Sequence, residues 1–476
     1  MGVPCLVTRT PPLVPLIEAD LLEVLEPGEP LAARIAQVFD ELDVVTARAD
    51  RARQHFLANT SYAAVADRIV PVFEQLLANT PELSPALATL ADTAGQVVDG
   101  GLPAAPVEAE TVAPVARIPR TDDPDARAVA AGDVVDVVVF WKQNDSGIYG
   151  RRQDMFVEEL ARSPRVGTIV HFDNPITPEA LVASYRAGRS SAADQRSLVA
   201  TETAARIAGR RDSPGVHRHT FLFGGRYSRR AGLPRRSGYV DWVRDVLERR
   251  GIGRRPVVVW AYPSNPDLPA LIDALAPDVV VADVVDDNRT WYEPGSERAA
   301  VIEENYREVL ARSDVVVANC EPVARSMEAF APTVHVVPNG CELPRGEPAG
   351  PRPAAVAGLD GPVVAYVGNL SSRLDIDLLE RVARARPQWN FVLVGSAHLD
   401  GEALRLDRLP NVHLLGVLTY PEVRRLLAHV DVGLIPHLDN EMTRSMNPLK
   451  AFVYASAGVP VVATPVANLP DLGPSM

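Results

Sequence analysis

Short runs of β-branched and other apolar residues alternate with longer helical patterns from residue 133 onward. In chain order the runs are DVVDVVVF, GTIVHF, PVVVWAY, DVVVADVV, DVVVANC and TVHVVP, then, after a Pro-rich connector that begins at Pro338-Asn339-Gly340, VVAYVG, FVLVG, NVHLL, DVGLIP and VPVVAT. Continuous apolar runs separated by helices are typical of parallel strands that are covered on both faces. The pattern therefore predicts an α/β protein with two doubly wound, Rossmann-like lobes, at residues 133–343 and 358–476.

The region before residue 133 has a different pattern. Residues 9–78 hold a turn and two helical patterns, whereas residues 79–132 are rich in Pro, Ala and Asp without an aromatic residue, which predicts a flexible linker. The first strand-like stretch, GVPCLVT at residues 2–8, is repeated near the end of the chain as GVPVVAT at residues 458–464. Two copies of one strand and turn cannot fill the same position in a single domain. A chance match between two strand starts is the alternative.

Composition is that of an ordinary globular protein, with 47% hydrophobic and 23% charged residues among 476. The sequence has no run of about 18 apolar residues and no basic stretch before an apolar one at its start, so we expect neither a spanning helix nor a signal peptide, and a cytoplasmic location. Cys5, Cys320 and Cys341 are too few and too scattered for a disulfide framework or a metal site. A net charge of −13 argues against general nucleic-acid binding.

Positive charge is unevenly distributed. The segment from Arg206 to Arg255 holds fourteen arginines and only four acidic residues, interleaved with Phe221, Phe223, Tyr227, Tyr239 and Trp242. It is either a solvated surface or a contact for anionic lipid headgroups, and the second interpretation predicts a peripheral protein at the inner face of the plasma membrane. Elsewhere, Lys142 and Lys450 are the two lysines among 48 basic residues. A lysine supplies a compact ammonium suited to a phosphate or sugar oxygen.

The loops that follow strands are where ligands of such sheets bind. After VVAYVG, the turn Gly368-Asn369-Leu370-Ser371-Ser372-Arg373 opens a helix, so a ligand could approach the backbone at the glycine and a phosphate could meet the helix start. A tight turn without a ligand is the alternative. The later stretch DVGLIPHLDNEMTRSMNPLKAFVYASAGVPVVATP resembles the sugar-nucleotide signature of family 4-like glycosyltransferases (glycosyl transferases group 1), which have the two-lobed GT-B fold.

This resemblance implies a nucleotide-diphosphate sugar as donor substrate, no other cofactor and no metal. It implies that Ser445 to Lys450 wrap the diphosphate and that Lys450 offsets charge on the leaving nucleotide. The implied donor-binding residues are Gly368, Asn369, Arg373, Gly395, Ser396, Tyr420, Ser445, Asn447, Leu449 and Lys450. A helix cap for Asn447 and a surface charge for Lys450 are the alternatives.

The sequence departs from the family pattern in the turn after VVAYVG, where Asn369 and Leu374 replace the usual Arg and Lys and Arg373 is a possible substitute, and at two positions of the later signature. The family usually has two glutamates eight positions apart, the later one bonded to the ribose hydroxyls, and here Ser445 and Val453 occupy those positions. Valine cannot accept a hydrogen bond, and loss of a charged bond to a buried hydroxyl costs about 1.5–3 kcal/mol. This favours a second hypothesis, in which the chain is a non-catalytic sugar-nucleotide-binding or scaffold lobe of a tandem glycosyltransferase. A GT-B epimerase is disfavoured because no acid-rich donor pocket is visible.

In the first lobe, the loop from Trp141 to Arg152 follows the first strand and resembles the flexible acceptor-side loop of these enzymes. The implied acceptor-side residues are Lys142, Asn144, Gly147 and Tyr149. Asp286 and Asp287 end the run DVVVADVV at the position where many relatives carry His-Asp, so they are candidates for a general base or for stabilising a developing positive sugar. Paired acids at strand ends also serve as helix caps, which is the alternative.

The segment 1–78 resembles the closing segment of a GT-B enzyme, through Pro27-Gly28-Glu29-Pro30, the basic run around Arg51 and Arg53, and Ser61-Tyr62. The second lobe ends at Met476 before such a segment, so we expect a lobe that lacks its C-terminal tail. Helices within residues 30–78 are expected to dock on this lobe, or else belong to a lost upstream enzyme. The activity expected for the whole chain is transfer of a sugar from a nucleotide-diphosphate donor to a lipid-linked or polysaccharide-precursor acceptor.

Overall fold

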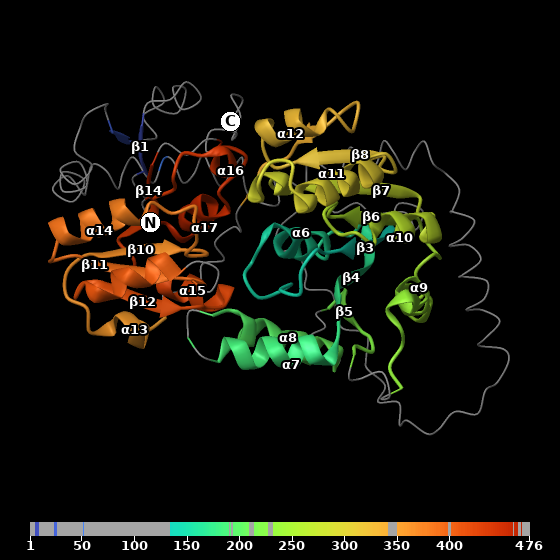
Figure 1. The fold of residues 1–476 in the computed structure, drawn as a ribbon, viewed down its shortest axis with the longest axis horizontal. Coiled ribbons are helices and arrows are strands. Elements are labelled where there is room, and N and C mark those ends of the chain that lie inside the picture. The colour runs from blue at the N-terminus through green and yellow to red at the C-terminus, as the bar shows by residue number, and fades with distance from the viewer. Residues whose placement is uncertain are drawn as a thin grey trace.

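A computed structural model describes residues 5–8, 23–25, 51, 134–189, 191, 194–208, 214–226, 232–340, 350–397, 401–459, 461–464 and 468. The elements form two lobes, each built on a seven-stranded sheet whose strands are all parallel, with helices on both faces (Figure 1). The two doubly wound lobes expected from the sequence are confirmed.

The first lobe has the strand order β5-β4-β3-β6-β7-β8-β9. Its strands are β3 (Val135–Phe140), β4 (Val166–Ile176), β5 (Val216–Leu222), β6 (Val257–Ala261), β7 (Val279–Val284), β8 (Val315–Ala318) and β9 (His335–Val336). Its helices are α6 (Arg152–Leu160), α7 (Pro178–Gly188), α8 (Arg196–Ile207), α9 (Tyr239–Arg249), α10 (Leu268–Leu275), α11 (Glu297–Leu310) and α12 (Glu321–Met327), with 3-10 turns η4 (Arg236–Gly238) and η5 (Asn288–Trp291). The order reverses between β3 and β6, and a ligand of such a sheet binds outside the carboxyl ends of strands at this point.

The second lobe repeats this design with the order β12-β11-β10-β13-β14, continued by β1 and β2. Its strands are β10 (Val363–Val367), β11 (Asn390–Val394), β12 (Val412–Gly416), β13 (Val432–Ile435) and β14 (Val461–Ala463). Its helices are α13 (Ala354–Ala357), α14 (Ile376–Ala385), α15 (Tyr420–Leu427), α16 (Glu441–Arg444) and α17 (Leu449–Ala457), with the 3-10 helix η6 (Gly401–Arg408). The reversal here lies between β10 and β13.

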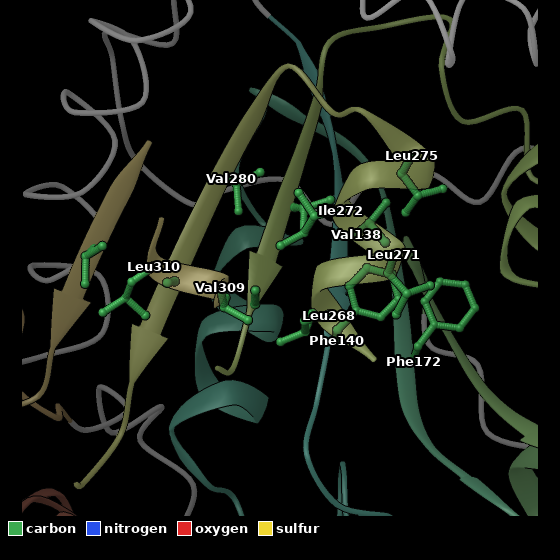
Figure 2. Packing of buried hydrophobic residues seen from close by; sticks show 14 of the residues in the cluster. Val138, Phe140, Phe172, Leu268, Leu271, Ile272, Leu275, Val280, Val309 and Leu310 are labelled. Atoms are coloured by element: carbon green, nitrogen blue, oxygen red, sulfur yellow. The ribbon is translucent and has the colours of Figure 1, made fainter. Parts of the chain in front are cut away.

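Each sheet is largely buried on both faces because its central strands consist mostly of apolar residues. In β3, Val138 and Phe140 pack into the cluster on one face, together with Leu271 of α10, whereas Val137 and Val139 pack into the cluster on the other face. Figure 2 shows the first of these clusters, in which side chains of α10 fill the space over β3, β4 and β7. Burying a large aliphatic side chain contributes about 1.5–3 kcal/mol, so these runs dominate the stability of the lobe.

The start of the chain joins the second lobe. Strand β1 (Cys5–Thr8) pairs in parallel with β14, and β2 (Glu23–Leu25) pairs in parallel with β1. The register sets Cys5 opposite Val461 and Leu6 opposite Val462, which are equivalent positions of the sequence repeat. The two copies therefore occupy neighbouring positions of one sheet. The helices expected within 30–78 and the linker expected at 79–132 lie outside the described residues, apart from Arg51.

The arginine-rich segment, residues 206–255, is folded into the first lobe where the structure describes it. It contains strand β5, which the apolar-run pattern missed, and the helix α9. Phe221 and Tyr239 are buried in the first-lobe core, with Phe223 and Trp242 packed against them, so the expectation that these rings face a membrane is wrong. Tyr227 lies outside the described residues. Among the described helices, none is long and apolar enough to cross a bilayer.

Candidate functional site

The carboxyl ends of the two sheets face each other across the junction between the lobes. Thr290 Oγ1 of η5 lies 3.4 Å from Ser445 Oγ at the end of α16, and the backbone N–H of Tyr420 donates to Ile148 O at 2.8 Å. Loops after β3 and β7 of the first lobe therefore lie beside loops of the second lobe. Most of the residues expected from the sequence to form a site lie at this junction.

Asp286 is placed directly after β7 with an unusual backbone. Its φ of 64° lies in the left-handed region, where a non-glycine residue is uncommon and is enriched at functional positions. Oδ1 accepts a hydrogen bond from Asn319 Nδ2 at 3.0 Å, and the side chain is only half-buried. Its negative charge acts on both Lys142 of the first lobe and Lys450 of the second. Asp286 thus lies where the two lobes meet and can reach a proton there.

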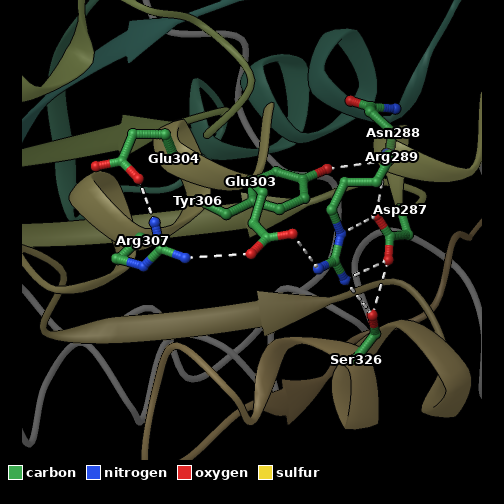
Figure 3. A network of polar contacts seen from close by, with 8 residues as sticks. All are labelled: Asp287, Asn288, Arg289, Glu303, Glu304, Tyr306, Arg307 and Ser326. Atoms are coloured by element: carbon green, nitrogen blue, oxygen red, sulfur yellow. Dashed lines mark hydrogen bonds and ion pairs between the residues drawn. The ribbon is translucent and has the colours of Figure 1, made fainter. Parts of the chain in front are cut away.

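The neighbouring Asp287 has a structural environment (Figure 3). Its carboxylate caps η5 through the Arg289 N–H, forms an ion pair with the Arg289 guanidinium at 2.8 Å, and accepts from Ser326 Oγ at 2.7 Å. Burial would raise the pKa of Asp287, but the hydrogen bonds from Arg289 and Ser326 hold it below its usual value. This carboxylate is therefore fixed as an anion that holds the loop, as the helix-cap alternative describes.

Lys142 lies in the loop after β3 among aromatic rings. Its Nζ donates to Asn288 Oδ1 at 2.9 Å and lies 5.6 Å from the centre of the Trp141 ring and 5.7 Å from that of Trp291. Burial lowers the pKa of Lys142 to about 8, although the charge of Asp286 opposes this shift. The ammonium is thus poorly solvated and close to the candidate base.

The rest of this loop is held from below by buried charges. Arg206 of α8 donates from Nη1 to Ser146 O at 2.8 Å and from Nη2 to Asn144 O at 2.5 Å, and its Nε lies 3.0 Å from Asp173. Ser146 Oγ donates to the same aspartate at 2.9 Å. Arg206 is buried, so this member of the arginine-rich segment positions the acceptor-side loop and does not face a membrane.

Gly147 and Tyr149 complete the expected acceptor-side residues. Gly147 has a φ of 75° and its N–H donates to Asp154 Oδ1 at 2.6 Å, so the loop turns over a buried carboxylate. Burial raises the pKa of Asp154 to about 6. Burial also raises the pKa of Tyr149, whose ring lies 5.5 Å from the Arg151 guanidinium. The conformation of this loop therefore depends on the left-handed backbone of Gly147 and on hydrogen bonds to buried groups.

In the second lobe, two glycine turns lie against each other at the carboxyl ends of β10 and β11. Gly368 and Gly395 have φ of 143° and 145°, and a Cβ at Gly395 would lie 1.9 Å from Gly368 O. A Cβ at Gly368 would lie 3.2 Å from Lys450 Cε. Asn369 and Ser396 follow these glycines, and their carbonyls accept from Tyr366 Oη and the Leu370 N–H. Only glycine permits such a close approach of the two turns to each other.

Lys450 is the centre of a basic cluster beside these turns. Its Nζ donates to His437 Nε2 at 3.0 Å and lies 5.0 Å from the centre of the Tyr366 ring. Burial, followed by the charge of Arg373, lowers the pKa of Lys450 to about 7, although the charge of Asp286 opposes the shift. Burial, Lys450 and Arg373 likewise keep the pKa of His437 far below its usual value. A neutral histidine and two under-compensated cations at the carboxyl edge of a sheet suit a polyanion.

Asn447 connects the lobes. Its Oδ1 accepts from the Asn339 N–H at 2.8 Å, its Nδ2 donates to Asn468 O at 2.8 Å, and its carbonyl accepts from Asn339 Nδ2 at 2.7 Å. The connector is held in turn by Arg152, which donates to Pro338 O at 2.8 Å and pairs with the buried Asp283 at 3.0 Å. The Asn447 side chain therefore links the two lobes, whereas the resemblance implies that it binds the sugar donor. This link fixes the position of Lys450, three residues later, relative to the first lobe.

Two further donor-lobe residues pack between the lobes. Tyr420 and Leu449 both contact the first-lobe hydrophobic cluster that contains Trp141 and Met155. A Cβ at Gly150 would lie 2.5 Å from the Tyr420 ring, so a glycine there lets the acceptor-side loop touch α15. Ser445 is buried and donates to Met442 O at 2.9 Å. These side chains maintain the arrangement of the lobes.

Several residues of this region were missed in the sequence. His437, Asn339 and Arg206 carry no motif of their own, because each takes its role from a partner far along the chain. Trp291, which is 36% exposed, lies beside Lys142. The signal in the sequence was the hydrophilic stretch at 286–290 that precedes this tryptophan. Among the described residues, no group of His, Cys, Asp and Glu side chains could hold a metal ion. The carboxylate of Asp375, for example, caps the start of α14.

Comparisons with known proteins show which sequences this chain resembles. Residues 361–473 match the model of the family Glycosyl transferases group 1. A protein of Bacillus subtilis (strain 168), whose name assigns it to teichuronic acid biosynthesis as the glycosyltransferase TuaH, is 29% identical over 235 residues. That alignment covers 46% of this chain and 57% of the relative, which is less than two thirds of its length. Both matches confirm the resemblance to group 1 glycosyltransferases.

The matches to solved structures have lower sequence identity. Sucrose-phosphate synthase from Thermosynechococcus elongatus has a TM-score of 0.47 at 15% identity, over 70% of this chain and 82% of that one. The Anabaena protein HepE, solved in complex with UDP, has a TM-score of 0.40 at 14% identity, over 71% of this chain and 83% of that one.

Proposed function

We propose that this chain, whose residues 361–473 match the group 1 glycosyl transferases, transfers a sugar from a nucleotide-diphosphate donor to an acceptor hydroxyl. The observation that carries the proposal is the basic cluster of Lys450 and Arg373 beside the two glycine turns of the second lobe, with Asp286 opposite on the first. The diphosphate lies at the basic cluster, and the acceptor lies on the loop after β3.

In the transfer step, the acceptor oxygen forms a bond to the anomeric carbon while the bond from that carbon to the diphosphate oxygen breaks. The hydroxyl proton passes to Asp286, and the nucleoside diphosphate leaves with the electron pair of the broken bond. Lys450 and Arg373 stabilise the negative charge that develops on the leaving group, and the low polarity around Lys450 strengthens this interaction.

The acceptor that we propose is lipid-linked or a polysaccharide precursor of the cell envelope. The name of the Bacillus relative supports this class. Arg249, Arg250 and Arg254 are exposed at the end of α9 and beyond it. We therefore propose an electrostatic contact of these arginines with an anionic membrane, in which the buried aromatic rings of the segment take no part. Cosedimentation with anionic vesicles should occur at low salt and disappear as ionic strength rises. Binding that ignores lipid charge and salt would remove this part.

The direct test is incubation of the full chain with a panel of nucleotide sugars and a native lipid extract, followed by mass spectrometry. A product heavier by one sugar residue, formed with release of the nucleoside diphosphate, is the expected result. If no sugar is transferred and no nucleotide binds, the proposal is wrong.

A second candidate is a non-catalytic sugar-nucleotide-binding lobe. Val453 favours it, because this side chain packs against the hydrophobic cluster of the second lobe where the family usually has a ribose-binding glutamate. Nucleotide binding without turnover on the whole panel would select this candidate. Replacement by glutamate, Val453→Glu, should then strengthen nucleotide binding about tenfold or more if the missing hydrogen bond is the cause.

A further inference from the structure

The two lysines of the chain come from different lobes and both interact electrostatically with one carboxylate, that of Asp286. Lys142 belongs to the loop after β3 in the first lobe and Lys450 to α17 in the second, and the charge of Asp286 acts on both. All other basic side chains among the 48 are arginines. If Lys450 serves the donor diphosphate, Lys142 is a second cationic position on the acceptor side of the same carboxylate.

Lys142 has neighbours that leave its charge under-compensated. Its Nζ has a neutral amide oxygen, Asn288 Oδ1, at 2.9 Å and the faces of two indole rings at 5.6 and 5.7 Å. Indole faces attract a cation but do not neutralise it. An ammonium held between aromatic rings at the end of a strand is therefore able to take up an anionic oxygen.

Asn288 supplies an independent observation. It is 6% exposed, and its Nδ2 has no hydrogen-bond partner among the described residues, although its Oδ1 is engaged by Lys142. Figure 3 shows that its side chain takes no part in the Asp287 network, which uses only the Asn288 backbone N–H. A buried amide donor without a partner costs about 1–3 kcal/mol, and a ligand oxygen beside Lys142 would satisfy it.

Trp291 adds an apolar surface at the same place. Its ring is 36% exposed and lies beside the Lys142 ammonium, three residues after Asn288 in η5. An indole face is a suitable platform for the C–H face of a sugar ring, while the polar groups next to it fix orientation. Thr290 Oγ1 of the same turn is 3.4 Å from Ser445 Oγ, so this platform lies at the lobe junction.

We propose that Lys142, Asn288 and Trp291 form an acceptor subsite for a sugar that carries a carboxylate or phosphate group. The ammonium and the Asn288 amide bind the anionic group, the indole supports the ring, and a hydroxyl of the bound sugar lies toward Asp286. This assignment rests on the proposed transferase function for the identity of the ligand as an acceptor. It makes the site a receptor for two anions, one on each lobe.

The test measures binding of three probes to the full chain saturated with UDP, by titration calorimetry at pH 7. The probes are a hexuronic acid disaccharide, a hexose 6-phosphate and a neutral hexose disaccharide. We expect at least one anionic probe to bind about tenfold or more tightly than the neutral one, as charge-assisted hydrogen bonds provide. Which anionic probe binds better distinguishes a carboxylate from a phosphate.

Two variants examine the subsite itself. Lys142→Met keeps a long apolar stem without the charge, and the preference should fall to within about twofold. Asn288→Asp keeps an oxygen for Lys142 but replaces the spare donor by a second anionic oxygen, so the anionic probes should lose their advantage or bind more weakly than the neutral one. Lys142→Arg should retain most of the preference. Arg186→Met, which replaces an exposed arginine of α7, is the matched control and should retain the preference fully.

The pH dependence has a defined sign. The charged groups that act on Lys142 are Asp286, Asp145, Asp283 and Arg151, and the pKa of Lys142 in the free protein is about 8. The ammonium is protonated below this pH, so affinity for an anionic probe should be highest below pH 8 and fall above it. Affinity for the neutral probe should not follow this profile, nor should the anionic probes in Lys142→Met.

The proposal is overturned if neither anionic probe binds, if the parent chain binds all three probes equally, or if the preference survives in Lys142→Met. Its failure is separable from that of the transferase proposal. If the chain does not bind UDP but still prefers the anionic probes, the proposed donor site is rejected and the subsite is kept. If the chain binds UDP and transfers sugar but does not prefer the anionic probes, the subsite is rejected and the transferase proposal is kept.

Discussion

The adjacent residues Asp286 and Asp287, which follow β7, have different environments. Asp286 is half-buried with a left-handed backbone, whereas Asp287 is buried against Arg289 and Ser326. The sequence presents the two as equivalent acids at a strand end. Only the direction of each side chain separates a candidate base from a structural anion.

Replacing the candidate base by Asp286→Asn should lower turnover by about 100-fold or more while the fold and nucleotide affinity are kept. Asparagine tolerates the left-handed backbone and retains an oxygen for Asn319, but it cannot take a proton. Steady-state transfer rates, with UDP affinity measured in parallel, check this. The matched variant Asp287→Asn should instead lower the melting temperature, because it leaves Arg289 without its ion pair. A parent-like rate in Asp286→Asn would assign the base elsewhere.

Lys450 predicts a pH dependence of donor binding. Its pKa of about 7 lies below the ordinary value of 10.5, so the ammonium loses its proton as the pH rises from 7 to 9. The terminal phosphate of a nucleotide is already ionised over this range, because its last pKa is about 6. UDP affinity should therefore fall with rising pH, by at most about tenfold per unit. Titrations at several pH values should show this slope in the parent and lose it in Lys450→Met.

At the scale of elements, the lobes are joined through the connector after β9 and the loop before α17. The reciprocal bonds of Asn339 with Asn447 are buried, and Arg152 extends them to Asp283 at the end of β7. This chain of contacts runs from the core of one lobe to the start of the helix that carries Lys450. A change in the connector is therefore expected to affect the proposed donor site.

We expect Asn447→Ala both to destabilise the protein and to weaken UDP binding. The variant leaves the Asn339 N–H and Asn468 O buried without their partner, at about 1–3 kcal/mol each, and frees the loop before Lys450. Asn411→Ala is the matched control, because Asn411 is also buried and bonded to three carbonyls but lies within the second lobe. It should lower the melting temperature without a comparable loss of UDP affinity. Equal losses of affinity in both variants would contradict the link.

At the scale of the whole molecule, the second sheet contains strands from both ends of the described chain. Strand β14 pairs with β13 on one side and with β1 on the other, and β2 lies beyond β1. Strands β1 and β2 are therefore part of the second-lobe sheet.

A cysteine trap tests this pairing. The register sets Cys5 opposite Val461, and neighbouring strands lie about 4.8 Å apart, within the range that a disulfide spans. Under mild oxidation Val461→Cys should form an intramolecular disulfide with Cys5, seen by peptide mass mapping. Ala463→Cys, two positions further along β14, should crosslink much less, and Cys5→Ser should abolish the crosslink. A crosslink between two chains, or none, would contradict the arrangement.

The sequence by itself determined the two lobes and most of their strands. Strands such as β6 and β8 are buried at every position and apolar throughout, so the run is visible without tertiary information. It also located the loops after β3, β7, β10 and before α17, because ligands of parallel sheets bind at strand ends. The edge strand β5 escaped, since His and Arg alternate with apolar residues in it.

Only the tertiary structure decided which side chains serve the site and which serve the scaffold. Arg206 and Asn447 look like surface or ligand-binding residues in the sequence, but their partners come from other elements and bury them. Asp286 and Asp287 differ through backbone conformation, and Lys142 and Lys450 meet at Asp286 through the packing of two lobes. Local patterns follow from burial and spacing along the chain, whereas charge environment depends on distances between residues that the sequence keeps far apart.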